Sequence, residues 1–317
     1  NLKVVSSKNI DFTSLNSMNK FSIIFDFFKL IKELNTIGKK YNDHIFIINT
    51  PLISHLFRLS TFFLKLKIIY FVHGYRFHNK GNFFLNLIFK AFEIVLSFNT
   101  TAYININDYD YIYTNSIIKK KSIKVNGIGI DLQNRYQQKK ILNKDFTIGI
   151  IAAYKKNKGY DDLIKICKNK NLSNKAKFIC YGYGDYNKYL NKINENNIEN
   201  LILNDFTNNI YSAIDKFDIV LHLSYREGLP VSLIQSLIRG KPVICYNVRG
   251  CVDLIKNNFN GYIIDIGNIN KVIETINFLI KNKNLLEKFS SNALNSINET
   301  YSNNYISKKI HELIIEL

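Results

Sequence analysis

The sequence contains no tryptophan, one methionine, three prolines and four cysteines among 317 residues. With so few prolines, no stretch has the composition of a Pro-rich disordered linker. The cysteines, Cys167, Cys180, Cys245 and Cys251, form no C-x-x-C pair and mostly lie inside apolar strand or helix patterns. They therefore predict reduced, buried side chains and a cytoplasmic protein.

Long uncharged runs are also missing. The most apolar stretches, Leu52–Val72 and Phe83–Phe98, are interrupted by charged residues such as Arg58, Lys65 and Glu93. Neither reaches the roughly 18 uncharged residues that a membrane-spanning helix needs. The first residues lack a signal-peptide pattern as well. We therefore predict no membrane-spanning helix.

Acidic residues are scarce relative to basic ones, 25 against 43, which gives a formal charge of +18. Such an excess is compatible with binding to nucleic acid or to a membrane. Asn, Ile, Lys, Tyr and Phe dominate, as expected when AT-rich codons drift through a gene, and we attribute most of the charge to drift. We predict no nucleic-acid partner. Lysines near an anionic membrane surface would still contribute about 1 kcal/mol each, which favours a peripheral position on the inner face of the plasma membrane.

Hydrophobic residues make up 46% of the chain, enough for two cores, and they occur in alternating strand and helix patterns. This alternation is typical of a doubly wound parallel α/β sheet. We expect strands at 2–5, 43–48, 67–73, 102–106, 146–151, 177–181, 201–203, 218–223, from 242, and at 261–265. We expect helices at 18–34, 52–64, 82–97, from 107 or 108, at 161–168, 186–194, 208–216, from 230, and at 271–280, 285–295 and 304–316.

The most informative stretch is Phe217–Tyr246, which reads as a strand, a polar turn, a helix beginning at Pro230 and a second strand. Ligands of open α/β sheets bind at the carboxyl ends of the strands, where such turns lie. The free amides of Val231 and Ser232 would form a phosphate site at the helix N-terminus. Glu227, just before them, supplies an acceptor for hydroxyl groups. A sugar attached to a diphosphate satisfies both groups.

Several motifs then follow in order: S-Y-R-E-G-L-P, G-K-P-V-I, V-R-G-C-V-D-L-I and N-G-Y-I-I. Together they resemble the donor-site block of retaining glycosyltransferases of family GT4, in particular the bacterial enzymes of capsular polysaccharide and O-antigen synthesis. The resemblance implies the GT-B fold, in which two Rossmann-like doubly wound parallel-sheet domains face a cleft. It places an acceptor-binding domain at residues 1–138, a nucleotide-sugar-binding domain at 139–300 and a returning helix at 301–317. Because residues 1–35 resemble what normally follows the family's first unit, we expect an N-terminal domain without its first strand.

The resemblance also implies roles for individual residues. Glu227 would orient the donor sugar, while the family's second glutamate, which binds the nucleotide ribose, is here Gln235. In A-A-Y-K-K-N-K-G, the family's diphosphate-binding Arg is replaced by Ala153, and its Lys is Lys158. The remaining donor-binding candidates are Gly228, Leu229, Pro230, Val231, Ser232 and, near the base, Phe206.

The segment F-V-H-G-Y-R-F-H resembles the family's T-A-H-G-F-H-F block. His73 is accordingly the second catalytic candidate, facing the cleft from the opposite wall. The alternative is a histidine that only caps a strand end. Gly74 would allow close approach of a ligand or backbone, and Arg76 and His78 are candidates for binding the acceptor.

Three other patterns carry less functional weight. Asp108 and Asp110 have the D-x-D spacing of a metal-binding motif, but two carboxylates opening a helix are explained as cap and dipole partners. We therefore predict no metal, and no cofactor other than the nucleotide-sugar substrate. The lysines at 119–121 and 124 predict a solvated face. The aromatic residues of helix 82–97 predict a core helix, or one whose outer aromatics rest on a bilayer.

We expect the protein to move a sugar, a hexose or an N-acetylhexosamine, from a nucleotide-diphosphate donor to a lipid-linked polyprenyl-diphosphate saccharide. The resemblance to the family implies UDP as the nucleotide. The anomeric configuration would be kept. Three alternatives stay open: a sugar-nucleotide epimerase of the same fold, an inactive paralogue, suggested by Gln235 and Ala153, and, from charge alone, a nucleic-acid-binding protein.

Overall fold

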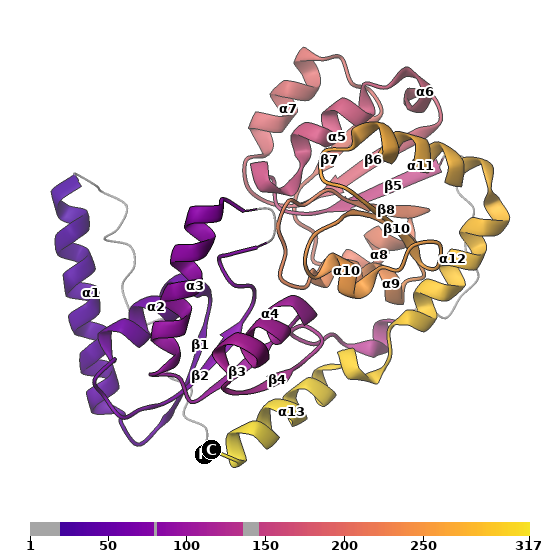
Figure 1. Cartoon of the computed structure of the whole chain (residues 1–317). Coiled ribbons are helices and arrows are strands. Elements are labelled where there is room, and N and C mark those ends of the chain that lie inside the picture. The colour runs from indigo at the N-terminus through magenta and orange to yellow at the C-terminus, as the bar shows by residue number, and fades with distance from the viewer. Residues whose placement is uncertain (1–19, 79–80, 136–145) are drawn as a thin grey trace.

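The computed structural model describes residues 20–78, 81–135 and 146–317, with side chains from residue 28 onward. Two parallel sheets form two α/β lobes (Figure 1). The first sheet has the strand order β1-β2-β3-β4, and the second β10-β9-β8-β5-β6-β7. All strand pairs are parallel. The prediction of two doubly wound Rossmann-like domains is therefore confirmed.

The strands are short and follow the apolar runs of the sequence. They are β1 Ile45–Asn49, β2 Lys67–Val72, β3 Ala102–Asn105, β4 Lys121–Lys124, β5 Phe146–Ile151, β6 Ala176–Tyr181, β7 Leu201–Asn204, β8 Ile219–His222, β9 Val243–Tyr246 and β10 Gly261–Ile264.

The helices alternate with the strands. They are α1 Lys20–Lys40, α2 Pro51–Ser60, α3 Phe83–Ser97, α4 Asp108–Tyr113, α5 Tyr160–Cys167, α6 Lys170–Ser173, α7 Tyr186–Glu195, α8 Ile210–Asp215, α9 Val231–Ile238, α10 Cys251–Leu254, α11 Ile269–Lys281, α12 Lys283–Ser296 and α13 Asn303–Ile315. One-turn 3-10 segments include η5, Lys156–Lys158.

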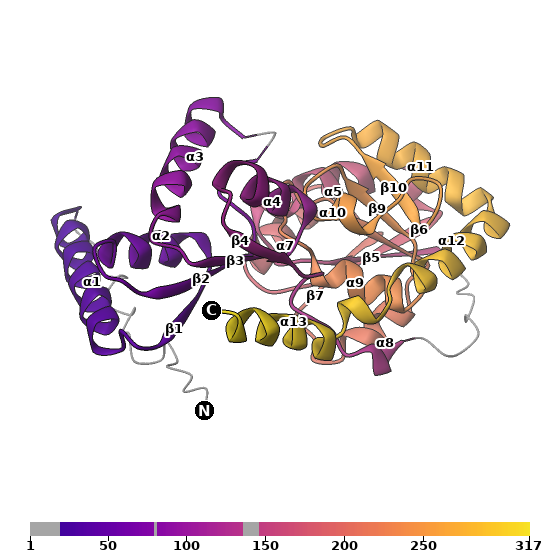
Figure 2. The same ribbon diagram turned by 60° about the horizontal axis from the view of Figure 1, so that its bottom comes forward.

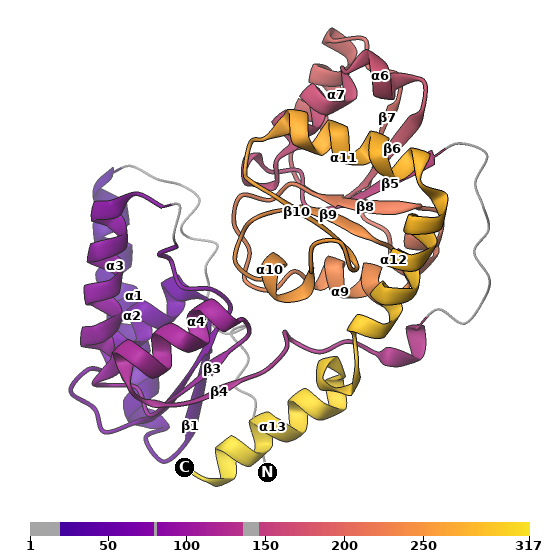
Figure 3. The ribbon, with the colours of Figure 1, turned by 45° about the vertical axis from the view of Figure 1, so that its right-hand side comes forward.

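In the N-terminal lobe, α1 packs on α2, while α4 packs on β3 and β4 (Figures 1 and 3). A buried ion cluster joins α2 to α3. Glu93 accepts a hydrogen bond from Arg58 at 2.8 Å and contacts the ring of His55 at 2.6 Å. Because both basic groups bond it, the pKa of the Glu93 carboxyl is lowered despite burial.

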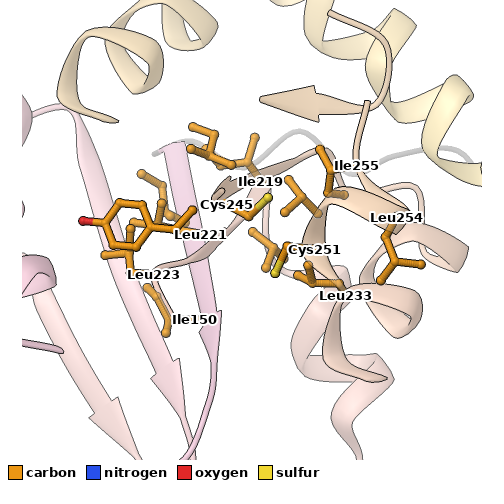
Figure 4. Close-up of a cluster of buried hydrophobic side chains, with 14 of the residues drawn as sticks. Ile150, Ile219, Leu221, Leu223, Leu233, Cys245, Cys251, Leu254 and Ile255 are labelled. Atoms are coloured by element: carbon orange, nitrogen blue, oxygen red, sulfur yellow. The ribbon is translucent and has the colours of Figure 1, made fainter. Parts of the chain in front are cut away.

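The core of the C-terminal lobe is built on β8 and β9, whose residues are all buried. Figure 4 shows side chains of these strands and of the following helices packing together, with Cys245 and Cys251 among them. All four cysteines are free and buried, as predicted. Residues buried on both faces of a central strand explain why these runs are continuously apolar.

Helix α13 crosses from the C-terminal lobe to the N-terminal one (Figures 1 and 2). Lys67 donates to the Leu317 carbonyl at 2.7 Å, and Lys121 lies 2.9 Å from the Glu316 carboxylate. Residue Ile130 forms a parallel bridge with Ser302. The chain end thus contacts both β2 and β4.

One strand was not expected, and one expectation needs correction. The lysine cluster was predicted as a solvated face, and Lys119, Lys121 and Lys124 are indeed exposed; Lys121 and Lys124 are also the ends of strand β4, which the sequence did not predict and which completes the first sheet. Its exposed lysines fit an edge strand. Helix α3 was predicted as a core helix for most of its aromatics, yet Phe83 and Phe84 are 74% and 72% exposed.

Other expectations lie outside the described residues. These are the strand at 2–5, the missing first strand and the domain boundary at 138/139. Within the described ranges, no helix is long and apolar enough to cross a membrane.

Candidate active site between the two lobes

The loops that follow β5, β8, β9 and β10 lie at the carboxyl edge of the second sheet, where ligands of this architecture bind. The loop after β8 carries Glu227 toward the N-terminal lobe. The loop after β2 carries residues 73–78 toward the same place. The two lobes meet through these loops, because Arg226 donates to the Tyr75 carbonyl at 2.9 Å.

Glu227 is held by two basic side chains on one carboxylate oxygen. Lys158, at the end of η5, donates from Nζ to Oε1 at 2.6 Å, and His222 Nε2 lies 3.0 Å from the same atom. Burial would raise the pKa of the Glu227 carboxyl, but the bonds and charges of His222 and Lys158 lower it to about 2. Glu227 is therefore ionised at neutral pH.

His222 is buried at the end of β8. Burial disfavours its imidazolium form, but the neighbouring Cys251 and Glu227 more than compensate and raise its pKa to about 9. The ring is therefore protonated at neutral pH and donates to the carboxylate. This histidine was missed in the sequence because it stands within an apolar strand pattern.

Helix α9 begins one residue later than predicted. Pro230 is its N-cap, with an extended backbone, and Val231 is the first helical residue. The first amides, of Val231 and Ser232, therefore still have no carbonyl partner four residues back, and both residues are half-buried. Leu229, buried before the helix, packs toward Gly127 of the segment that leaves the first lobe.

Glycines allow the two lobes to touch. A Cβ atom at Gly228 would lie 2.0 Å from the carbonyl oxygen of His73, so only glycine fits this contact. Gly74 has a φ of +131°, and a Cβ there would lie 2.9 Å from Nη2 of Arg249. These two motif glycines are therefore explained by contact between the lobes.

Arg249, after β9, bridges the lobes. It donates to the carbonyls of Tyr75 at 2.9 Å, Phe77 at 3.2 Å and Glu227 at 3.0 Å. Its guanidinium also lies 2.8 Å from the carboxylate of Asp110. Asp110 therefore has an ion-pair partner in the other lobe. The predicted helix cap is also present, because the Asn107 side chain accepts a hydrogen bond from the Asp110 amide.

A cavity of about 220 Å³ lies between the loops of both lobes. Glu227 lines it, together with residues that follow β8, β9 and β10 and two residues of the first lobe. The other lining residues are His78, Tyr109, Tyr225, Arg226, Asn247, Val248, Arg249, Val252 and Ile266.

The remaining predicted residues lie around this centre. His73 contacts Asn49 Oδ1 at 3.1 Å and stacks on Phe71, so its ring is engaged within the first lobe, and burial lowers its pKa. Arg76 is exposed and lies over the ring of Phe89. Of the acceptor candidates, His78 lines the cavity, where burial and the charges of Arg226 and Arg249 lower its pKa.

None of the predicted donor-binding residues is among the residues that line this cavity; Lys158 reaches it only through its bond to Glu227. Gln235 is a half-buried residue of α9. Phe206 follows β7 and is 67% exposed. Phe206 thus lies beyond the edge strand β7, away from the cavity at β8, β9 and β10, whereas Gln235 lies on the helix that packs against β8 and β9.

The comparisons with known proteins agree with this architecture. Residues 133–296 match the family described as glycosyl transferases group 1, which is just over half of the chain. A poly(ribitol-phosphate) alpha-N-acetylglucosaminyltransferase of Staphylococcus aureus is 32% identical over 166 residues, 51% of this chain and 34% of that protein. The chain thus spans about a third of that relative's length.

A second relative is aligned over nearly the whole chain. The N,N'-diacetylbacillosaminyl-diphospho-undecaprenol alpha-1,3-N-acetylgalactosaminyltransferase of Campylobacter jejuni is 25% identical over 321 residues, 98% of this chain and 78% of that protein. Among solved structures, Anabaena HepE in complex with UDP-glucose superposes with a TM-score of 0.75 at 17% identity, covering 90% of this chain and 82% of that chain. It shares the two-lobed fold. The chain belongs to the glycosyl transferases group 1 family.

Proposed function

We propose that this protein transfers a sugar from a nucleotide-diphosphate donor, UDP in the first instance, to a lipid-linked saccharide, with retention of the anomeric configuration. The observation that carries the proposal is the position of Glu227. Its ionised carboxylate lines the cavity between the lobes, bonded to Lys158 and directly before the N-terminus of α9. A sugar diphosphate requires this combination of a hydroxyl acceptor and positive charge.

The charges fit the reaction. Cleavage of the anomeric bond leaves negative charge on the diphosphate, which the Lys158 ammonium and the amides of Val231 and Ser232 would stabilise. Lys158 has three N–H donors, so it can bond Glu227 and a phosphate oxygen together. Glu227 would accept bonds from sugar hydroxyls. The acceptor hydroxyl would attack from the leaving-group side and pass its proton to the departing diphosphate.

The relatives support the substrate classes. The Campylobacter enzyme is named for a diphospho-undecaprenol-linked acceptor, and HepE binds UDP-glucose. We extend these classes to this chain as a hexosyl or N-acetylhexosaminyl transfer in surface-polysaccharide synthesis. Because a lysine and a helix N-terminus already supply positive charge to the diphosphate, we propose a reaction without metal or cofactor.

An acceptor with a lipid chain requires access to a membrane. Helix α3 exposes Phe83, Phe84, Leu87 and Ile88, which are 57–74% exposed, on the lobe assigned to the acceptor. We propose that this face rests on an anionic bilayer at the cytoplasmic side, with the exposed Arg76 beside it.

The direct test is a transfer assay with a panel of radiolabelled sugar nucleotides and polyprenyl-diphosphate saccharides. The wild-type protein should label an acceptor, and Glu227→Ala should reduce the rate about a hundredfold or more. Glu274→Ala, on the surface of α11, is the matched control. Full activity of Glu227→Ala would refute the assignment. Conversion of the sugar nucleotide into its epimer without any acceptor would favour an epimerase.

Two positions favour a second candidate, an inactive paralogue. Gln235 stands where the resemblance places the family's second glutamate, and Ala153 where it places an arginine. Both changes remove donor contacts expected of an active enzyme. A protein that fails to bind any nucleoside diphosphate would support this candidate.

A further inference from the structure

The cavity between the lobes carries an excess of positive charge that its own acidic groups do not balance. Arg226 and Arg249 both line it, and Glu227 is its one carboxylate among the lining residues of the described chain. Glu227 already has two cationic partners, Lys158 and His222. Asp110, close by, is paired with Arg249.

The two arginines differ in their bonding. Arg249 uses all three of its guanidinium nitrogens, on three carbonyls and the Asp110 carboxylate, and its side chain is 6% exposed. Arg226 has one protein partner within the described residues, the carbonyl of Tyr75. A guanidinium has five N–H donors, so most of those of Arg226 remain available to the cavity.

The surroundings of Arg226 disfavour its positive charge. Its side chain is half-buried, and partial burial together with the charges of Arg249 and Arg76 lowers its pKa. Arg226 stays protonated, as arginines in proteins do. The lowering of its pKa therefore means that its positive charge is repelled by the neighbouring arginines. A bound anion would relieve this repulsion and use the open donors.

The rest of the lining suits a sugar. Tyr109, Val248, Val252 and Ile266 present aromatic and aliphatic surface, which packs against the apolar face of a pyranose ring. A volume of about 220 Å³ corresponds to several water molecules at about 30 Å³ each. The cavity therefore has the size of a small polar ligand such as one sugar unit with its substituent.

We propose that Arg226 binds an anionic group, a carboxylate or a phosphate, of the saccharide substrate that enters the cavity beside Glu227. The inference rests on the proposed function and adds a specificity to it. The planar guanidinium pairs with two oxygens of either anion through two parallel hydrogen bonds. The anion has two possible sources, an acidic sugar or the diphosphate of the lipid-linked acceptor.

Isothermal titration distinguishes these sources. The full chain, saturated with UDP so that the donor phosphate site is filled, is titrated with methyl glucuronide, with the neutral methyl glucoside and with pyrophosphate. We expect the glucuronide, the pyrophosphate or both to bind, and the glucoside to bind at least about tenfold more weakly than the better anion. Preference for the glucuronide identifies an acidic sugar, and preference for pyrophosphate identifies the acceptor diphosphate.

Variants distinguish a specific contact of Arg226 with the anion from a general effect of positive charge on the protein. Arg226→Gln should weaken anion binding about tenfold or more, and Arg226→Lys, which keeps the charge but not the two parallel bonds, should lie between. Lys271→Gln, on the surface of α11, removes one charge and should change nothing. Unchanged UDP affinity shows that the variants are folded.

The proposal is overturned if neither anion binds better than the glucoside, or if Arg226→Gln binds the anion as well as the wild type. Failure of the proposed function gives a different result, since UDP itself would then not bind. The glucuronide and glucoside titrations can still be compared in that case on the chain without UDP, with the thermal midpoint of each variant in place of UDP affinity as the measure of folding.

Discussion

The guanidinium of Arg249, in the loop after β9, lies 2.8 Å from the carboxylate of Asp110 at the start of α4, in the other lobe. Both side chains are buried, at 6% and 0% exposure. Burial raises the pKa of Asp110 in spite of the arginine, which shows how poorly this site would tolerate the carboxylate alone. The pair therefore holds the loop after β9 against α4 of the other lobe, beside the cavity.

Arg249→Met should reduce stability by about 3 kcal/mol, because Asp110 would be left buried without its partner. Thermal unfolding followed by calorimetry measures the loss. The double variant Arg249→Met with Asp110→Asn should recover part of it. Lys271→Met, which breaks an exposed pair with Glu274, should cost less than about 1 kcal/mol. A double variant whose loss equals the sum of the losses of Arg249→Met and Asp110→Asn measured singly would show that the pair is not coupled.

His222 should make stability depend on pH. Its pKa is raised from 6.5 to about 9 on folding, so the folded state binds the proton more tightly. The contribution is complete below pH 6.5 and is lost as the pH rises through about 9. His222→Gln should flatten the decline of the thermal midpoint over this interval, whereas the exposed His311→Gln should leave it unchanged. A decline that persists in His222→Gln would assign it to other groups.

Helix α3 should bind vesicles. Sedimentation with vesicles containing phosphatidylglycerol should carry down more protein than vesicles of phosphatidylcholine alone, because the chain has a formal charge of +18. Phe83→Ser combined with Phe84→Ser should weaken binding about tenfold, since two exposed rings would no longer enter the bilayer. Phe278→Ser, an exposed ring on α11 of the other lobe, serves as control. If only Phe278→Ser lost vesicle binding, the surface that contacts the bilayer would be on α11 and not on α3.

The alternation of strands and helices could be predicted because buried parallel strands are continuous apolar runs, and Phe146–Ile151 was placed to the residue. The start of α9 was one residue off, since proline fixes φ but not ψ, and Pro230 has an extended ψ of 113°. β4 was missed because an edge strand need not be apolar, and its lysines were interpreted only as a solvated face.

At the site, Glu227 and Lys158 were found through their motifs, and the structure brings them into contact. Their roles remain predictions. His222, Arg226 and Arg249 were not singled out, although Arg226 and Arg249 stand in the quoted motifs. The roles of Arg226 and Arg249 depend on contacts with the other lobe, such as Arg226 with Tyr75, 151 positions away, which a single sequence does not encode as a pattern. His222 contacts Glu227 only five positions away, but its place in an apolar strand pattern concealed it.

The account depends on a nucleoside diphosphate bound by Lys158 and the N-terminus of α9 beside Glu227. Isothermal titration with UDP, and with GDP in parallel, tests this most directly. We predict that the wild-type protein binds UDP and that Lys158→Gln binds it about tenfold more weakly, because one charge-assisted bond to the diphosphate is lost. Lys271→Gln should bind as the wild type does. If neither nucleotide binds the wild-type protein, or if Lys158→Gln binds with undiminished affinity, the account is wrong.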